Sequence, residues 1–330
     1  MPLLDVRDLN VRFPTEDGTV HAARSVSFAL DGGEVLAVVG ESGSGKSVTA
    51  MAIMGLLPRN ALVSGSVLLG GEEILGADQH RLSRLRGHRI GMIFQDPMSS
   101  LNPVYRIGWQ LAEAVRAHQS VTRRAARARA VELLGMVGIP EAEQRADSYP
   151  HEFSGGMRQR VMIAMAMANE PEVLIADEPT TALDVTVQAQ VLRTLMEVRE
   201  RSGVAILLIT HDLGVVAATA DRVQVMYAGA VVESGTTDQL FGQPRMPYTS
   251  ALLRAMPGLV GRHGRLAQIP GSPPSLVGLA GGCPFAPRCE HTADVCRSSE
   301  PELLPTDLPG HRAACHRWAE VAVRSEGVSG

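Results

Sequence analysis

A glycine-rich segment at residues 40–47, GESGSGKS, constrains this chain more than any other feature of its sequence. It follows an apolar run, Val35–Val39, and precedes a helix-like stretch, Val48–Leu57. The pattern G-x-x-x-x-G-K-S lets the backbone bend until several N–H groups point at one anion, and the N-terminus of the next helix adds its dipole. We therefore expect a strand, a phosphate-cradling loop and a helix in succession. The alternative is a glycine-rich turn without a ligand.

Two side chains of this segment bring specific phosphate chemistry. Lys46 would neutralise charge on the β- and γ-phosphates, and the hydroxyl of Ser47 would ligate Mg²⁺. The loop backbone and the first helical turn would supply the other contacts. The expected phosphate-binding residues are Gly40, Ser42, Gly43, Ser44, Gly45, Lys46, Ser47 and Val48.

Short runs rich in Val and Ile recur through the first ~240 residues and are followed by polar residues. We predict buried strands at Val35–Val39, Arg89–Phe94, Val173–Ala176 and Val204–Ile209. Helix-length segments such as Arg123–Met136 and Val187–Arg201 lie between them. This alternation predicts an α/β fold with a mostly parallel sheet that binds ligands at the carboxyl ends of its strands. The opening segment, Leu3–Leu30, has shorter alternating patches that indicate an antiparallel strand set.

Polar side chains follow three of these predicted strands. Asp177 and Glu178 come directly after Val173–Ala176, where the first acid could hold Mg²⁺ and the second could polarise an attacking water. Gln95 follows one neighbouring strand and His211 another. Taken alone, an Asp-Glu pair is as compatible with a solvated strand end, and a single His with a structural role. The phosphate loop upstream favours the catalytic interpretation.

A second candidate anion site opens at residues 153–160, FSGGMRQR, where Ser154 can cap a helix and two glycines follow it. The alternative is a capped helix without a ligand. Together with the phosphate loop, Gln95, the Asp-Glu pair, residues 182–184 (ALD) and His211, in this order, the segment resembles the ATP-binding subunit of ABC transporters. Its signature motif most often begins with Leu, which is Phe153 here.

The resemblance implies a fold and a mechanism. The fold is a P-loop NTPase core with a mostly parallel sheet, an antiparallel β subdomain and a helical signature subdomain. Two such subunits sandwich two ATP molecules, and each ATP is held by the phosphate loop of one chain and the signature helix of the other. The signature contacts would come from Ser154, Gly155, Gly156 and Gln159.

The same resemblance assigns roles to single residues. Glu178 would be the general base, and His211 would contact the γ-phosphate. Gln95 would touch Mg²⁺ or water and link the site to the membrane partner. Asp184 would bridge the two ATP-binding subunits, and Phe13 would stack on adenine.

Finer matches lie at residues 94–103 (FQDPMSSLNP), 226–229 (MYAG) and 247–249 (PYT). They resemble the oligopeptide, dipeptide and nickel importer branch, and most of all its dipeptide-permease ATP-binding subunits. This likeness implies a peripheral ATPase on the cytoplasmic face of the membrane that energises uptake of dipeptides or oligopeptides. It further implies a heterodimer with a second ATPase, two transmembrane permease subunits and an extracytoplasmic peptide-binding protein. The alternatives are import of nickel or another small solute, and a soluble ABC ATPase without a transport role.

The four cysteines of the chain are Cys283, Cys289, Cys296 and Cys315. Disulfides are disfavoured because the chain shows no export signal. Tetrahedral zinc is possible, although structural zinc usually brings C-x2–4-C pairs, which this spacing lacks, and a tail without any metal is a further alternative. Four thiolates can also hold an iron–sulfur cluster. The importer branch has a similar cysteine-containing tail, and that resemblance implies a [4Fe–4S] cluster on these four residues.

Composition restricts the possible classes of protein and indicates where the domains divide. A net charge of −4 argues against a non-specific nucleic-acid binder, and no apolar run approaches the ~18 residues that a membrane span needs. Pro and Gly punctuate the chain beyond Gln243. We therefore expect an ATP-binding domain at residues 1–243, with its helical subdomain at about 96–165, and a loop-rich tail at 244–330 that carries the cysteines.

Overall fold

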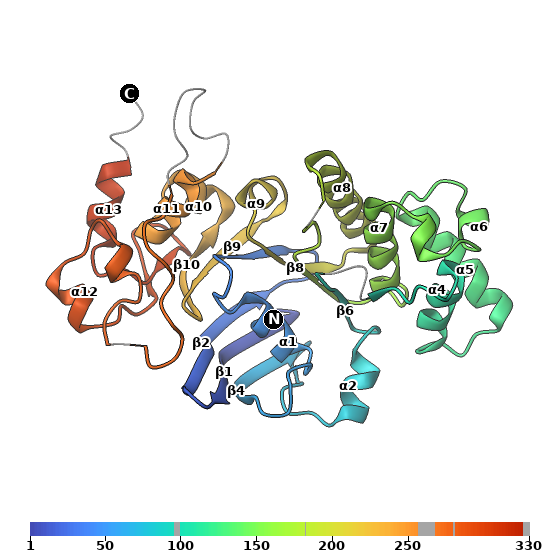
Figure 1. The fold of residues 1–330 in the computed structure, drawn as a ribbon, viewed down its shortest axis with the longest axis horizontal. Helices are drawn as coiled ribbons and strands as arrows, with labels where there is room; N and C mark the ends of the chain where they lie inside the picture. The colour runs from blue at the N-terminus through green and yellow to red at the C-terminus, as the bar shows by residue number, and fades with distance from the viewer. Residues whose placement is uncertain (96–99, 182, 257–267, 280, 326–330) are drawn as a thin grey trace. The chain divides into compact units, whose positions relative to one another are not determined.

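The computed structural model describes residues 1–330 except 96–99, 182, 257–267, 280 and 326–330. The chain forms two compact units, each assembled from separate stretches of sequence (Figure 1). The first unit comprises Met1–Leu4, Ala29–Val35 and Leu68–Ile209. The second comprises Asp5–Phe28, Leu36–Val67 and Thr210–Gly330.

The first unit is built on three parallel strands in the order β8-β7-β6, with bounds Ala205–Thr210, Val173–Asp177 and Ile90–Ile93. Every residue of the three strands is buried, which explains their continuous Val, Ile and Leu runs. The strands predicted here are confirmed to within one or two residues. Upstream lie α2 (Gln79–Leu85) and the two-residue strand β5 (Glu72–Glu73), which pairs with the end of β4.

An ion pair fixes the start of β6 against the start of β7. Arg89 forms two hydrogen bonds with the carboxylate of Glu172, and its Nη2 lies 2.9 Å from Oε2. The carbonyl of Arg89 also accepts hydrogen bonds from the N–H groups of Glu172 and Val173. Because the strands are parallel, holding their starts in register brings their carboxyl ends level at the opposite edge.

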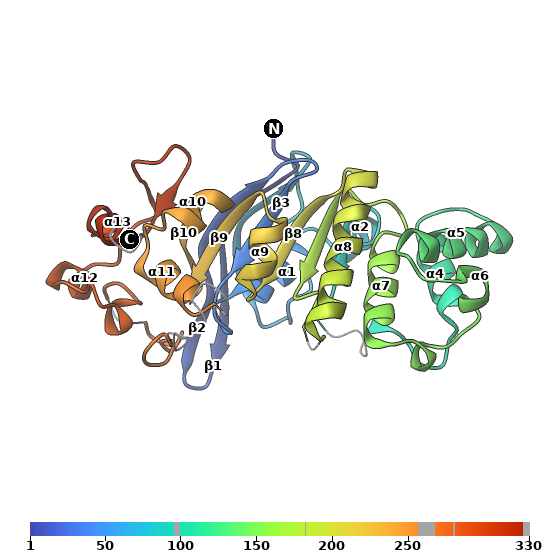
Figure 2. The ribbon, with the colours of Figure 1, turned by 90° about the horizontal axis from the view of Figure 1, so that it is seen from above.

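Beyond β6, the described residues of the first unit form several further helices. They are α4 (Ile107–Arg116), α5 (Arg123–Met136), α6 (Ala142–Arg145), the 3₁₀ turn η1 (Pro150–Glu152), α7 (Gly155–Ala166) and α8 (Val185–Ser202). Figure 2 shows α4, α5 and α6 grouped beside α7. The hydroxyl of Thr122 caps α5 by accepting from the N–H of Ala125, and α5 buries a stripe at Ala126, Ala130, Leu133 and Leu134.

The second unit has a sheet in the order β3-β9-β10-β12-β11, with bounds Val35–Val39, Arg222–Tyr227, Ala230–Thr236, Arg312–Ala313 and Leu304–Pro305. Strand β9 runs parallel to β3 and antiparallel to β10. A second sheet places β2 (Gly18–Leu30), β1 (Leu4–Thr15) and β4 (Leu62–Leu69) side by side. The two-residue connection between β1 and β2 makes that pair antiparallel, as expected for the opening segment. The helices are α1 (Lys46–Ile53), α9 (Leu213–Thr219), α10 (Thr237–Gly242), α11 (Pro247–Arg254), η2 (Ala286–Arg288), α12 (Asp294–Ser298) and α13 (Trp318–Ser325).

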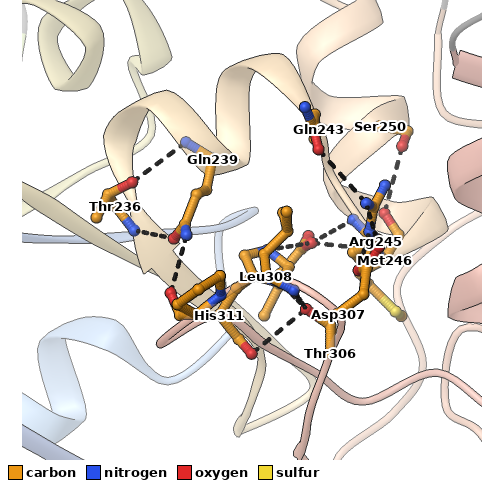
Figure 3. A network of polar contacts seen from close by, with 12 residues as sticks. Thr236, Gln239, Gln243, Arg245, Met246, Ser250, Thr306, Asp307, Leu308 and His311 are labelled. Atoms are coloured by element: carbon orange, nitrogen blue, oxygen red, sulfur yellow. Dashed lines mark hydrogen bonds and ion pairs between the residues drawn. The ribbon is translucent and has the colours of Figure 1, made fainter.

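The described residues beyond 243, which we expected to form a loop-rich tail, group with this second unit. Strand β12 pairs with β10, and Arg245 forms an ion pair with Asp307 at 3.1 Å (Figure 3). The fully buried carboxylate of Glu233 accepts hydrogen bonds from the backbone N–H groups of Arg245 and Met246 and lies 3.1 Å from the ring of His311. Pro and Gly break this region into short elements, but buried polar contacts hold those elements in place.

Among the described residues, no helix combines the length and the apolar character that crossing a bilayer requires.

Replacing Glu172 by Gln tests the role of its ion pair with Arg89. The hydrogen bond from Arg89 lowers the pKa of Glu172 below its ordinary value of 4.5, so the pair stabilises the fold above that value and the effect fades as pH falls through the lowered pKa. Because the pair is partly exposed, we expect a loss below about 1 kcal/mol at pH 7 that shrinks toward pH 4 in urea unfolding. The control Glu132→Gln, at a more exposed carboxylate, should show no change. A deficit that is constant with pH would contradict this role.

Candidate functional site

The phosphate loop lies between β3 and α1 in the second unit, as its spacing predicts. The ammonium of Lys46 is buried, and it donates to the carbonyls of Gly40 at 2.8 Å and Glu41 at 2.9 Å and to the hydroxyl of Ser44 at 3.3 Å. The loop thus wraps around one positive charge at the N-terminus of a helix. This arrangement suits an anion with several oxygens, such as a polyphosphate.

Glycine is required at Gly45 by its surroundings as well as by its backbone. Its φ is +102°, and a Cβ atom there would lie 2.2 Å from the carbonyl oxygen of Ala22 in β2. The carbonyl of Gly45 accepts from both the N–H and the hydroxyl of Thr49, which fixes the first turn of α1. The loop therefore packs directly on the backbone of β2.

A buried aromatic cluster supports the other end of the loop. The N–H of Glu41 donates to the hydroxyl of Tyr248 at 2.9 Å. The ring of Tyr248 lies 4.5 Å from that of Tyr227, and Phe285 packs edge-on against both. Burial raises the pKa of Tyr248 and of Tyr227, so both hydroxyls are neutral at physiological pH.

The carboxylate of Glu41 is paired with Arg288, a residue that our sequence analysis did not single out. The two side chains form a bidentate ion pair with distances of 2.6 and 3.0 Å. The hydrogen bond with Glu41 is also the main reason that the pKa of Arg288 is raised. No local pattern could have revealed this contact, since 247 positions separate the two residues.

The acidic strand end belongs to the first unit. Asp177 ends β7 and is 3% exposed, and Glu178 follows it in the left-handed region at φ +46°. The Glu178 carboxylate accepts from the amide of Gln95 at 2.9 Å and from the hydroxyl of Thr181 at 2.7 Å. Its backbone N–H donates to the carbonyl of Ile209. The structure therefore brings Gln95 and Glu178 together as expected, and it adds Thr181, which our sequence analysis did not single out.

Two other sequence-predicted residues lie in the second unit. His211 follows β8 and is exposed, and Phe13 lies in β1 and is half-buried. Their predicted contacts with phosphate and adenine remain predictions.

The signature segment opens α7 in the first unit. The hydroxyl of Ser154 caps the helix by accepting from the N–H of Met157 at 3.3 Å. Gly156 allows α8 to approach, because a Cβ atom there would lie 2.3 Å from a methyl group of Val187. Gly155 is exposed, whereas Gln159 is 2% exposed and lies inside the unit.

Asp184 accepts a hydrogen bond from the N–H of Val187 and caps α8. That bond neither requires nor excludes the predicted bridge to a second subunit. Residues 96–99 and Ala182, which belong to two of the quoted motifs, lie outside the described residues.

All four cysteines are described and are free thiols. They line one small cavity of about 20 Å³ together with His291 and His316, and none of the described Asp or Glu residues lines it. Burial raises the pKa of Cys283 to about 11 and that of Cys315 to about 12, so these thiols are protonated at neutral pH unless a cation displaces the protons. Within the described part of the chain, no group of three or more His, Cys, Asp or Glu side chains is arranged to hold a metal ion. The predicted cluster therefore remains a prediction.

The glycine-rich loop around a buried lysine and the acidic strand end define the class of P-loop nucleotide-binding proteins. Comparison with known proteins narrows this class. Residues 23–181 match the family model described as ABC transporter, and residues 232–296 match that of the oligopeptide/dipeptide transporter C-terminal region. The chain belongs to the ABC transporter family, in its oligopeptide/dipeptide branch.

Individual relatives agree with this placement. The chain is 57% identical to the oligopeptide transport ATP-binding protein OppD of Mycobacterium bovis over 98% of its own length, but it spans only 53% of that protein, about half. It is 51% identical to the OppD protein of Escherichia coli over 96% of its own length and 94% of the relative. Among solved structures, a dimeric bacterial ABC transporter cassette matches 71% of this chain and 98% of its own, with a TM-score of 0.63 and 27% identity. These likenesses confirm the ABC ATPase cassette fold.

Alanine at Gly45 should damage the loop more than alanine at Gly43. Both glycines have positive φ, but only a Cβ atom at position 45 meets another atom closely, whereas none lies within 4 Å at position 43. We expect Gly43→Ala to cost about 1 kcal/mol of unfolding free energy and Gly45→Ala at least about 2 kcal/mol, measured by urea unfolding without nucleotide. Equal losses in the two variants would show that contact with β2 does not constrain the loop.

Proposed function

We propose that this chain is the ATP-binding and hydrolysing subunit of an ABC importer that energises uptake of dipeptides or oligopeptides. The observation that carries the proposal is the phosphate loop wrapped around the buried ammonium of Lys46. The importer assignment is supported by the names of the OppD relatives and by the match to the branch-specific C-terminal region.

In this proposal the loop holds the triphosphate of ATP, and Glu178 takes a proton from the attacking water. The amide of Gln95 and the hydroxyl of Thr181 both donate hydrogen bonds to the Glu178 carboxylate, and these bonds would orient it toward the water. His211 would contact the γ-phosphate, and Phe13 would stack on adenine. Bound Mg²⁺ would neutralise phosphate charge and would be held by Ser47, Asp177 and Gln95.

The site would be completed by a second ATPase subunit. Ser154 and Gly155 are exposed at the N-terminus of α7, where a helix dipole can meet phosphate held by the partner. Gly156 keeps that terminus close to α8, whose cap Asp184 would bridge the two subunits. Gln159 would support the helix from inside the unit, since it is buried.

Membrane partners would bind an exposed apolar surface of the first unit. Tyr105 and Trp109 stack at 4.2 Å while both remain substantially exposed, and Val104 beside them is 70% exposed. Exposed clustered aromatics are typical of interaction sites. We propose that two permease subunits dock on the two ATPases from the membrane, so that the chain lies at the cytoplasmic face. The assembly would receive peptides from an extracytoplasmic binding protein and would not engage nucleic acid.

We further propose that Cys283, Cys289, Cys296 and Cys315 are the ligands of a [4Fe–4S] cluster. The donor set supports this, because four thiols and no carboxylate line one cavity. Backbone N–H groups of His291 and Arg317 each lie 3.4 Å from a cysteine sulfur, and such hydrogen bonds are common at iron–sulfur sites. Against it stands the size of the cavity, which at about 20 Å³ requires the sulfurs to move outward. When bound, a cluster would cross-link the loops that carry the cysteines.

Replacing Glu178 by Gln tests the assigned base. The amide keeps the size of the side chain but cannot accept the proton, so we expect ATP hydrolysis by the complex with its permease subunits to fall at least about 100-fold. ATP binding should persist, and the ATP-bound dimer should accumulate in size-exclusion chromatography. As a matched control, Glu132→Gln on the surface of α5 should leave hydrolysis unchanged. Wild-type turnover in Glu178→Gln would remove this residue from the mechanism.

Replacing Cys289 by Ser tests the cluster. We expect anaerobically purified wild-type chain to carry iron, acid-labile sulfide and a visible absorption band, and the variant to lose all three. Iron content should be measured beside the absorption spectrum, and zinc should be measured in the same samples. Full iron content in the variant would exclude Cys289 as a ligand, and zinc without iron in the wild type would replace the cluster by a zinc site.

A further inference from the structure

The phosphate loop carries a negative charge of its own at its second position. Glu41 lies next to Gly40, and its backbone carbonyl is one of the acceptors that hold Lys46. The loop concentrates N–H groups and an ammonium to attract an anion, whereas an unpaired carboxylate in the same loop would repel that anion. Glu41 therefore needs a counter-charge if the loop is to bind a triphosphate well.

Arg288 supplies that counter-charge, and all three nitrogens of its guanidinium donate hydrogen bonds. Nη1 and Nη2 donate to the two carboxylate oxygens of Glu41, and Nη1 also lies 3.3 Å from the hydroxyl of Tyr227. Nε donates to the carbonyl of Pro270 at 2.9 Å. The side chain is 4% exposed, so solvent screens this bidentate pair weakly.

The backbone of Arg288 is also hydrogen-bonded, because its N–H donates to the carbonyl of Phe285 at 2.9 Å. Arg288 is the last residue of η2, and Phe285 immediately precedes that turn. The ring of Phe285 packs against Tyr227 and Tyr248, the tyrosines that support the loop. Upstream of η2, the N–H of Cys283 donates to the carbonyl of Cys296 at 2.8 Å. These hydrogen bonds and ring contacts of the cysteine-bearing segment fix the position of Arg288 beside the phosphate loop.

The same segment also contacts the strand on which the loop packs. Val277 forms a β-bridge with Val20, and the carbonyl of Leu276 accepts from the N–H of His21. The next residue of β2, Ala22, is the one whose carbonyl lies against Gly45. Described residues between 270 and 289 therefore meet the phosphate loop directly, where Arg288 pairs with Glu41, and indirectly, where Leu276 and Val277 contact β2.

We propose that Arg288 is a positioning residue for nucleotide binding, which neutralises Glu41 and holds the phosphate loop in the shape that accepts a triphosphate. It makes the cysteine-bearing segment part of the nucleotide site of its own chain. The inference rests on the proposed function, because it assumes that the loop binds ATP.

A double-mutant cycle on the full chain tests this inference, with a fluorescent ATP analogue titrated in the presence of Mg²⁺. Arg288→Ala leaves the Glu41 carboxylate unpaired beside the phosphates, so we expect the affinity to fall about tenfold or more. Adding Glu41→Gln removes the repulsion, so E41Q/R288A should return to within about threefold of wild type. Arg288→Lys keeps the positive charge but cannot form the bidentate pair with the Glu41 carboxylate, so we expect an intermediate loss of affinity.

Arg254→Ala is the matched control, because it removes an exposed ion pair with Glu290 from the same region and should leave affinity unchanged. Thermal unfolding of each variant reports whether the tail still folds. If Arg288→Ala does not fold, Arg288→Lys with and without Glu41→Gln makes the same comparison.

Three outcomes are distinguishable. Wild-type affinity in Arg288→Ala overturns the inference. A loss that Glu41→Gln does not rescue also overturns it, because Arg288 would then only support the tail. Lys46→Ala should lose ATP binding in either case, so unchanged affinity in that variant would instead refute the proposed function.

Discussion

The close approach of backbone to backbone around the phosphate loop is the constraint on which the second unit depends. A Cβ atom at Gly40 would lie 2.2 Å from the carbonyl of Met226 in β9, and one at Gly45 would meet β2 at the same distance. The turn after β9 completes the enclosure, since the N–H of Gly229 donates to the carbonyl of Ser44. Strands β2 and β9 and the turn after β9 can pack directly on the backbone of the phosphate loop because Gly40 and Gly45 have no side chains. This packing fixes the direction in which the N–H groups of the loop point.

Glu41, in the second unit, and Glu178, in the first, each accept hydrogen bonds from side chains distant in sequence. Glu41 is paired with a guanidinium, which removes its charge from the field that a phosphate would meet. Glu178 accepts hydrogen bonds from the amide of Gln95 and the hydroxyl of Thr181, and these bonds orient its carboxylate. Its backbone lies at φ +46°, a strained conformation for a residue with a side chain, and such strain is common at functional positions.

Much of the fold and part of the site could be predicted from sequence because they depend on local pattern. Strand β3 has the bounds that its apolar run predicted, and Gln95 meets Glu178 because parallel neighbours end at one edge. The motif at 247–249 was visible only as a family likeness. The structure explains Tyr248, whose hydroxyl accepts the N–H of Glu41. Arg288 could not be found, since nothing near it in sequence indicates which carboxylate it would meet. Contacts that tie described residues beyond 243 to one another, such as Arg245 with Asp307, could not be predicted for the same reason.

The separation of 247 positions between Glu41 and Arg288 has a consequence for how the protein is made. A ribosome releases the N-terminal end first, and at ~5–20 residues per second the loop emerges about 12–50 seconds before the arginine that neutralises it. During that interval the nascent chain has a phosphate loop with an unpaired acid and without its aromatic support from Phe285. Under the role proposed for Arg288, a product that ends before position 288 would bind ATP more weakly than the finished subunit, because its phosphate loop carries an unpaired acid.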